Sequence, residues 1–141
     1  YRDSAVSLAK DCDILMVVTP GDAGSAKLVD KQVLEALGPQ GALVNIARGS
    51  VVDEDALVEA LRNRTIMTAG LDVFAREPEV PQALIDLEEV VLLPHVGSAS
   101  QHTRNAMGQL QIDNLVSFAH GLGPITPVAE TPWPATKDAA K

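Results

Sequence analysis

The sequence has little cysteine, no long apolar run and no excess of positive charge, and each shortage excludes a class of protein. Cys12 is the only cysteine among 141 residues, so one chain can form neither an internal disulfide nor a thiolate metal cluster, and we expect no metal site. No apolar run approaches the roughly 18 residues of a membrane span, and no basic-then-apolar signal opens the chain. A formal net charge of −8 disfavours binding to nucleic-acid phosphates. We therefore expect a cytoplasmic protein whose partners include neither membrane nor nucleic acid.

Short apolar runs alternate with stretches of helical period, and this alternation predicts an α/β fold with a parallel sheet. The continuous apolar run 13–18 is typical of a strand that is buried on both faces. Strands are expected at 13–18, 42–46, 67–73 and 90–93. Helices are expected at 3–10, at 30–38, after Asp53, around Leu84 and Leu87, and at 100–120.

Capping residues mark several of these helices. Asp30 and Asp53 are expected to cap helix N-termini, and Gly38 is expected to close the helix that Asp30 opens. The long helix 100–120 should end at Gly121, and the proline-rich remainder should hold no regular structure. The long helix 100–120 has an approximate apolar stripe, which consists of Met107, Leu110, Leu115 and Phe118.

The chain lacks a Gly-rich phosphate loop. No G-x-G-x-x-G occurs, although the other features are those of a dinucleotide-binding fold, and the chain begins directly in a helix-like segment. We therefore expect it to be an incomplete portion of a longer protein, which by itself would bind a dinucleotide weakly and show no turnover.

Polar residues follow the predicted strands, where ligands bind in open α/β sheets. Arg48 offers a planar fork of donors for a carboxylate, and His95 can exchange a proton near neutral pH. Glu77, made extended by the following proline, could orient that histidine, and Asp72 must be paired or face a polar ligand. Taken singly, each has an ordinary alternative: a surface arginine, a structural histidine, a solvated glutamate and a helix-capping aspartate.

Three segments together are more specific than any single residue. They are LVNIARGSVVDE at 43–54, AGLDVFAREP at 69–78 and VLLPHVGSA at 91–99. They closely resemble the signature segments of the D-isomer-specific 2-hydroxyacid dehydrogenases, and within that family the glyoxylate/hydroxypyruvate reductases. The resemblance implies the C-terminal half of a Rossmann-like NAD(P)-binding domain at 1–99, an interdomain helix with a substrate-domain segment at 100–128, and a flexible tail at 129–141.

The same resemblance implies roles for individual residues. Arg48 would bind the carboxylate and keto oxygen of a small 2-keto acid, His95 would be the general acid/base, and Glu77 would orient His95. The cofactor would be NAD or NADP, with NADP slightly favoured, and the protein would be a homodimer. Asp72 would accept a hydrogen bond from the carboxamide of the nicotinamide. The residues expected along the cofactor are Thr19, Pro20, Ala47, Arg48, Asp72, His95, Gly97 and Ser98.

Some positions depart from the family pattern. Arg64 stands where glycine commonly closes a helix, so we expect Asn63 to take the closing conformation, and Thr68 likewise replaces a common glycine. Asp22 replaces a glycine after Thr-Pro-Gly, which affects the local cofactor contact. The resemblance also implies that the long helix 100–120 leaves apolar surface exposed.

Related functions remain as alternatives. A phosphoglycerate dehydrogenase-like enzyme is one, although its pattern after the histidine differs from 97–104, and formate dehydrogenases resemble this chain less. A dinucleotide-sensing module like the C-terminal-binding corepressors, which keep a similar set of residues, is an alternative of another class.

Overall fold

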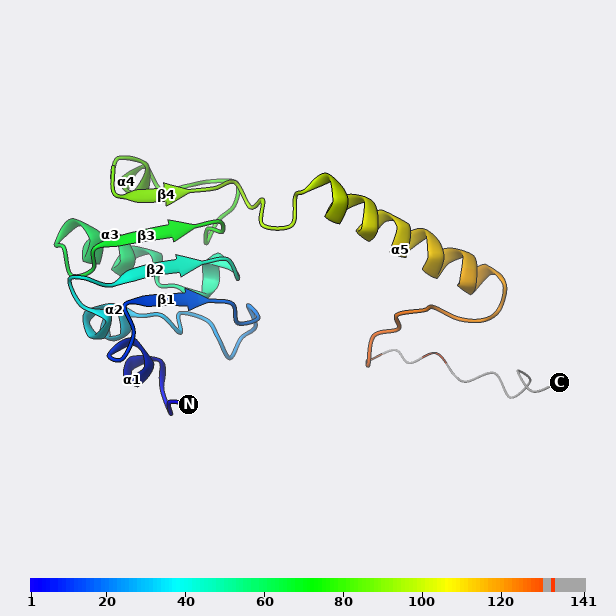
Figure 1. The fold of residues 1–141 in the computed structure, drawn as a ribbon, viewed down its shortest axis with the longest axis horizontal. Helices are drawn as coiled ribbons and strands as arrows, with labels where there is room; N and C mark the ends of the chain where they lie inside the picture. Colours follow the sequence, from blue (N-terminus) through cyan, green and yellow to red (C-terminus); the bar gives the residue numbers. More distant parts are fainter. Residues whose placement is uncertain (131–132, 134–141) are drawn as a thin grey trace. The chain divides into compact units, whose positions relative to one another are not determined.

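The computed structural model describes residues 1–130 and Trp133, and the chain divides into two compact units whose boundary along the sequence falls between Gly97 and Ser98. Strands and helices alternate along the first unit, which confirms the α/β prediction (Figure 1). In chain order its elements are α1 (Ala5–Ala9), β1 (Ile14–Val17), α2 (Lys31–Leu37), β2 (Ala42–Asn45), the 3-10 helix η1 (Gly49–Val51), α3 (Glu54–Arg62), β3 (Thr68–Leu71), α4 (Gln82–Ile85) and β4 (Val90–Leu92). The second unit contains α5 (Gln101–Ala119).

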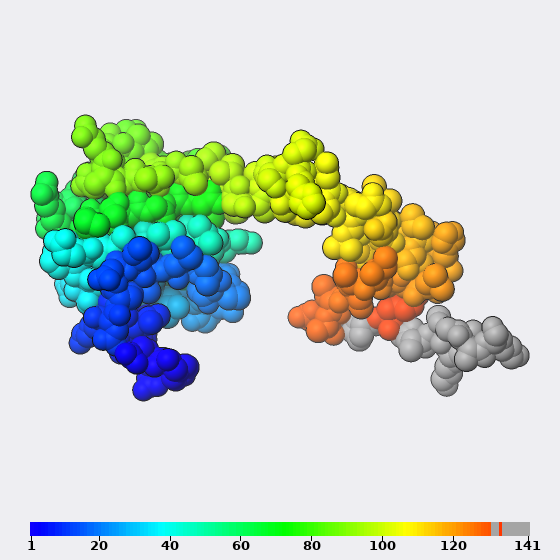
Figure 2. Space-filling model, in the orientation of Figure 1, coloured from blue at the N-terminus to red at the C-terminus, as the bar shows by residue number. Residues whose placement is uncertain are grey.

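The described residues form one parallel sheet of four strands in the order β1-β2-β3-β4. Figure 2 shows the β4 segment, in yellow-green, lying along the β3 segment, in green. The register pairs Val17 with Asn45 and Asn45 with Leu71, so the carboxyl ends of the first three strands stand in one row. Leu92 of β4 pairs with Leu71 and extends that row. The loops after all four strands therefore leave from the same edge of the sheet.

The helices of the first unit begin where the sequence supplies a cap. Asp30 accepts a hydrogen bond from the Val33 amide at the start of α2, and Asp53 accepts one from the Ala56 amide at the start of α3. Both predicted caps are confirmed. Gly38 follows α2 with φ 80°, a backbone angle that favours glycine.

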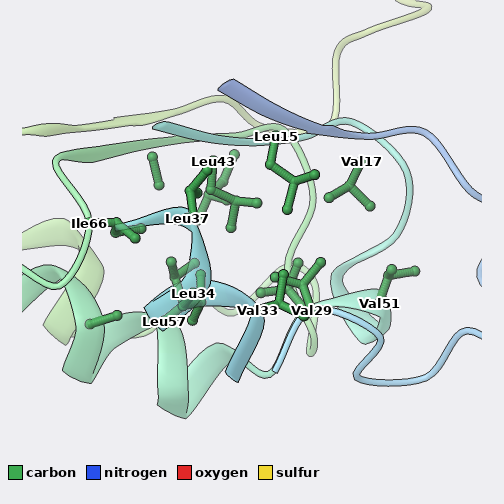
Figure 3. Close-up of a cluster of buried hydrophobic side chains, with 14 of the residues drawn as sticks. Leu15, Val17, Val29, Val33, Leu34, Leu37, Leu43, Val51, Leu57 and Ile66 are labelled. Atoms are coloured by element: carbon green, nitrogen blue, oxygen red, sulfur yellow. The ribbon is translucent and has the colours of Figure 1, made fainter. Parts of the chain in front are cut away.

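The hydrophobic core lies between the sheet and its helices, where Figure 3 shows the side chains gathered. Alternate strand residues point into it, among them Leu15 and Leu43, while α2 contributes Leu34 and α3 contributes Leu57. All of these side chains are less than 10% exposed. Burial of each such side chain contributes about 2 kcal/mol, so this one core fixes the sheet and the loops at its edge.

The opposite face of the sheet corrects a prediction from the sequence. Ile14 and Met16 of β1 are 61% and 56% exposed, so the expectation that this strand is buried on both faces is wrong for this chain. The buried residues of α1 to α4 all belong to one core cluster with Leu15 and Val17. Side chains alternate along a strand, so Ile14 and Met16 point to the face that these helices do not cover.

The end of α3 also differs from expectation. Arg64, with φ 54°, adopts the left-handed conformation, whereas Asn63 has φ −85°. The Thr65 amide donates to the Ala60 carbonyl and the Arg64 amide to the Leu61 carbonyl, which is the Schellman arrangement. That arrangement requires a positive φ one residue after the cap, and that residue is Arg64.

The short helix around Leu84 ends earlier than predicted. α4 ends at Ile85, so Leu87 lies beyond the helix.

The second unit consists of α5 and the segment that follows it. Ser100 caps α5, and Gly121 follows it with φ 75°, as predicted. No regular element follows in the described residues up to Glu130, but Asn114 bonds the amide of Thr126 and holds the segment against the helix. Most of the tail predicted at 129–141 lies outside the described residues.

The surface of α5 is apolar over much of its circumference. Leu115 and Phe118 of the predicted stripe are 69% and 54% exposed, as expected from the resemblance. Ile112 and Val116 are also exposed and, at about 100° per residue, lie on other sides of the helix, so the stripe is not confined to one face. None of the helices in the described residues is both long and apolar enough to cross a membrane.

Candidate active site

Glu77 and His95 meet at the carboxyl edge of the sheet. Nδ1 of the His95 imidazole lies 2.7 Å from Oε2 of Glu77. The other carboxylate oxygen of Glu77 accepts a hydrogen bond of 3.0 Å from the Phe74 amide. Both oxygens are therefore engaged, and the direction from which the carboxylate meets the imidazole is fixed by the backbone that follows β3.

The neighbours of Glu77 stabilise the ionised form of its carboxyl group. The hydrogen bond with His95, the Phe74 amide and the nearby positive charges of His95 and Arg48 lower the pKa of Glu77 below its ordinary value. Glu77 is thus ionised at neutral pH, and a carboxylate at Nδ1 keeps the proton of the neutral ring on that atom. Nε2 is then the ring nitrogen through which a proton would be exchanged with a ligand.

The backbone of His95 adopts a conformation that is uncommon for a residue with a side chain. Its φ is 54°, in the left-handed region. The next two amides, of Val96 and Gly97, donate to the two carboxylate oxygens of Asp72 at 2.7 and 2.8 Å. Asp72 is 4% exposed, so the loop that carries His95 is tied to a buried charge at the end of β3. The helix-cap alternative for Asp72 is wrong.

Arg48 stands at the same edge, in an extended conformation between β2 and η1. Its side chain is exposed, and Nη1 donates to the Ala47 carbonyl at 2.7 Å. Gly21, from the loop after β1, lies so close to the Arg48 side chain that a β-carbon there would overlap its stem. Arg48 follows β2, which pairs with β3, so it lies at the same edge of the sheet as the Glu77–His95 pair, and its charge is the smallest of the influences that lower the pKa of Glu77.

Two hollows lie beside these residues. One, of about 450 Å³, is lined by four of the predicted cofactor residues, Thr19, Pro20, Ala47 and Arg48, together with residues next to them in the sequence. The other, of about 160 Å³, places Phe74, Pro78, Val80 and Pro94 around Glu77 and His95. These apolar residues border the Glu77–His95 contact on one side, while the His95 and Glu77 side chains remain 46% and 35% exposed.

The other predicted cofactor residues Asp72, Gly97 and Ser98 do not line the hollow of about 450 Å³. The amide of Gly97, in the loop that carries His95, donates to the carboxylate of Asp72, and Ser98 is the first residue of the second unit. Asp22, whose effect on cofactor contact was in question, uses Oδ1 to accept from the amides of Gly24 and Ser25. Its carboxylate therefore stabilises its own loop.

Asn45 is a residue of this site that the sequence reasoning missed. It is 1% exposed, accepts a hydrogen bond from the Ala47 amide at 3.0 Å and donates one to the Arg48 carbonyl at 3.1 Å. The signal was an amide side chain within an apolar strand, because a buried polar group must find partners.

Comparison with known proteins connects this geometry with a family. Residues 1–97 match the model of the D-isomer specific 2-hydroxyacid dehydrogenase NAD binding domain. Hydroxyphenylpyruvate reductase of Plectranthus scutellarioides and glyoxylate/hydroxypyruvate reductase A of Arabidopsis thaliana are each 48% identical over 128 residues, which are 91% of this chain and 41% of each relative. The chain thus spans less than half the length of these curated relatives.

A solved structure agrees in fold as well as sequence. The NADPH-dependent glyoxylate/hydroxypyruvate reductase of Sinorhizobium meliloti, in complex with NADP and malonate, matches with a TM-score of 0.90 and 53% identity over 94% of this chain and 42% of that one. The likeness includes the sheet at whose edge Arg48, Glu77 and His95 lie. The chain belongs to the D-isomer specific 2-hydroxyacid dehydrogenase family, and its residues 1–97 match the NAD-binding domain of that family.

Proposed function

We propose that the full-length protein containing this chain reduces a small 2-keto acid of the glyoxylate or hydroxypyruvate type to the D-2-hydroxy acid, with NADPH or NADH as reductant. The observation that carries the proposal is the Glu77–His95 contact of 2.7 Å, with Arg48 after the neighbouring strand β2 at the same edge of the sheet. The names of the relatives, several of which are glyoxylate or hydroxypyruvate reductases, support the substrate class.

In this reaction, Arg48, His95 and Glu77 would each have a distinct role. The guanidinium of Arg48 would bind the substrate carboxylate and neutralise charge on the keto oxygen. His95 would give its Nε2 proton to that oxygen as the C–O bond becomes single. Glu77 would hold the ring by Nδ1 and compensate the charge that the ring gains and loses. Bound NAD(P)H would supply the hydride that the keto carbon receives.

The edge of the sheet has features that fit a dinucleotide. The loop after β1 lies against Arg48, and the hollow of about 450 Å³ between them is open at the carboxyl ends of β1 and β2. Dinucleotides bind in this position in doubly wound sheets. Four of the lining residues, Thr19, Pro20, Ala47 and Arg48, offer backbone groups, a hydroxyl and a cation. Asp72 could accept from a carboxamide only through lone pairs that Val96 and Gly97 leave open.

Steady-state oxidation of NADPH and NADH by the full-length protein tests this function. Glyoxylate and hydroxypyruvate should be turned over, and phosphohydroxypyruvate should be reduced more slowly. Hydroxyphenylpyruvate belongs in the same panel, because one relative that is 48% identical carries that name. Preference for phosphohydroxypyruvate would favour the phosphoglycerate dehydrogenase alternative. Cofactor binding without turnover of any keto acid would contradict the proposed enzyme and favour a dinucleotide-sensing module.

The proposal includes a homodimer in the cytoplasm, both parts of which derive from the sequence and the family resemblance. Light scattering of the purified full-length protein tests the first part. A mass twice that of one chain supports the dimer, and a monomeric mass at micromolar concentration contradicts it.

A further inference from the structure

Three polar side chains are buried within the described residues, and each is bonded to a loop that leaves the carboxyl edge of the sheet. They are Ser25, Asn45 and Asp72, with exposed fractions of 6%, 1% and 4%. Ser25 bonds the Pro20 carbonyl and the Asp22 amide in the loop after β1. Asn45 and Asp72 do the same for the loops that carry Arg48 and His95. A buried polar group that had no such role would only cost stability.

The contacts of Asp72 require the conformation of His95. Two successive amides, of Val96 and Gly97, point to one carboxylate, and a chain forms such a concave pair of donors when a residue beside them takes the left-handed conformation. That residue is His95, with φ 54°. A β-carbon on Gly97 would lie 3.0 Å from Oδ2 of Asp72, so glycine leaves the carboxylate its room. The left-handed turn in turn aims the imidazole at Glu77.

Asn45 likewise holds the loop that carries Arg48, through two hydrogen bonds of its side chain. Its amide oxygen accepts from the Ala47 amide and its amide nitrogen donates to the Arg48 carbonyl, so one side chain closes the turn from β2 into η1. The turn sets the extended backbone of Arg48, whose φ and ψ are −142° and 146°. A donor and an acceptor are both needed here, whereas Asp72 faces two donors. The choice of amide at 45 and carboxylate at 72 therefore matches the groups that each must satisfy.

We propose that Asp72 and Asn45 are positioning residues of this site: Asp72 sets the loop that presents His95 to Glu77, and Asn45 sets the loop that presents Arg48. The inference that this positioning serves catalysis rests on the proposed function. The part concerning the Glu77–His95 contact does not, and it can be tested without substrate.

The first test is the titration of Glu77 in protein labelled with ¹³C at the glutamate carboxyl carbons, with Glu77→Gln assigning the signal. The pKa of Glu77 is lowered chiefly by its hydrogen bond with His95. Asp72→Asn keeps the shape but places an amide donor against one of the two backbone donors, so the His95 loop should shift and the pKa of Glu77 should rise towards its ordinary value. Ser25→Ala is the matched control, because it removes a buried polar group from another loop, and it should leave the Glu77 titration unchanged.

A second variant covers the case in which Asp72→Asn does not fold. Gly97→Ala keeps the charge but presses a β-carbon against Oδ2, and it should raise the pKa of Glu77 in the same direction by less. A lower thermal midpoint with an unchanged Glu77 titration, in whichever of these two variants folds, would show that Asp72 has only a structural role and would overturn the proposal.

Kinetics of the full-length protein supply the catalytic part. Displacement of a catalytic group by about 1 Å can cost about a hundredfold in rate, so Asp72→Asn should lower kcat/KM by about that factor, mainly through kcat. Asn45→Asp, which replaces the donor that faces the Arg48 carbonyl, should act mainly by raising KM for the keto acid. Wild-type kcat and KM in folded variants would overturn the proposal. If the wild-type protein itself shows no turnover, the proposed function fails, while the Glu77 titration still decides the positioning of His95.

Discussion

Glu77 contacts His95 through Oε2 and Nδ1 at 2.7 Å, although the two residues are 18 positions apart and lie after different strands. The parallel pairing of β3 and β4 brings their carboxyl ends together, so the loop after β3 can meet the loop after β4. The contact therefore follows from the topology of the sheet, and each partner is fixed by a backbone bond of its own loop.

Glu77→Gln should lower kcat without abolishing folding. The amide is neutral, so it neither fixes the ring as strongly nor compensates the charge of the imidazole during proton transfer. We expect kcat for keto acid reduction to fall by about a hundredfold. Glu79→Gln is the matched control, because Glu79 is exposed and only two positions away. Equal losses in both variants would contradict a specific role for Glu77.

Arg48→Lys should weaken substrate binding more than cofactor binding. Lysine keeps the charge but lacks the planar pair of donors that a carboxylate accepts bidentately, and loss of one charge-assisted hydrogen bond costs about 2 kcal/mol. KM for the keto acid should therefore rise by an order of magnitude or more. Arg62→Lys in the last turn of α3 should have no such effect. An unchanged KM in Arg48→Lys would remove Arg48 from the substrate site.

Gly49→Ala should destabilise the first unit. A β-carbon at Gly49 would overlap the backbone of Phe74 and Ala75, which cannot move without disturbing the loop of Glu77. Overpacking of this kind costs about 1–3 kcal/mol in the free energy of unfolding, measured by urea denaturation. The matched change is Gly108→Ala in α5, where nothing lies within 4 Å and the helix should gain about 1 kcal/mol. A Gly49→Ala protein as stable as wild type would contradict the close packing of these two loops.

Acid should remove a stabilising contribution of Asp53. Its hydrogen bonds with Lys27 and the Ala56 amide lower the pKa of Asp53 in the folded state. The unfolded chain, with a pKa of about 3.9, then binds the proton more readily. The contribution is therefore complete above about pH 4 and is lost as the pH falls through the lower folded pKa.

Asp53→Asn tests this dependence while keeping a good N-cap. Because the Lys27–Asp53 pair is partly exposed, the variant should be less stable than wild type by about 0.5 kcal/mol at pH 7. The difference should vanish well below pH 4. Urea unfolding at both pH values measures it, and a difference that does not change with pH would contradict the assignment.

Local patterns were sufficient to predict most elements. Strand positions and the caps Asp30 and Asp53 depend on neighbours a few residues away, and these agree with the structure. The exposure of Ile14 and Met16 was not predictable in this way, because it depends on which segments cover the second face of the sheet. The left-handed Arg64 was missed because the Schellman bonds fix the position after the cap, whatever residue occupies it.

In the candidate site, too, some residues could be identified from the sequence and others only from the structure. Arg48, Glu77 and His95 were proposed from the resemblance of three sequence segments to one family, since each of them taken singly has an ordinary alternative. The bonds of Asn45 and Asp72 were not, because they depend on how two loops fold back onto the strand ends. An uncommon polar residue in or after an apolar strand is the sequence signal that would point to such contacts.

In the proposed reaction His95 donates the proton to the keto oxygen, and a single-turnover measurement tests this role most directly. Full-length His95→Gln, saturated with NADPH and mixed with glyoxylate, should transfer hydride at least about a hundredfold more slowly than wild type while binding NADPH with similar affinity. His102→Gln, at an exposed position in α5, should react at the wild-type rate. Hydride transfer by His95→Gln within about twofold of the wild-type rate would contradict the account.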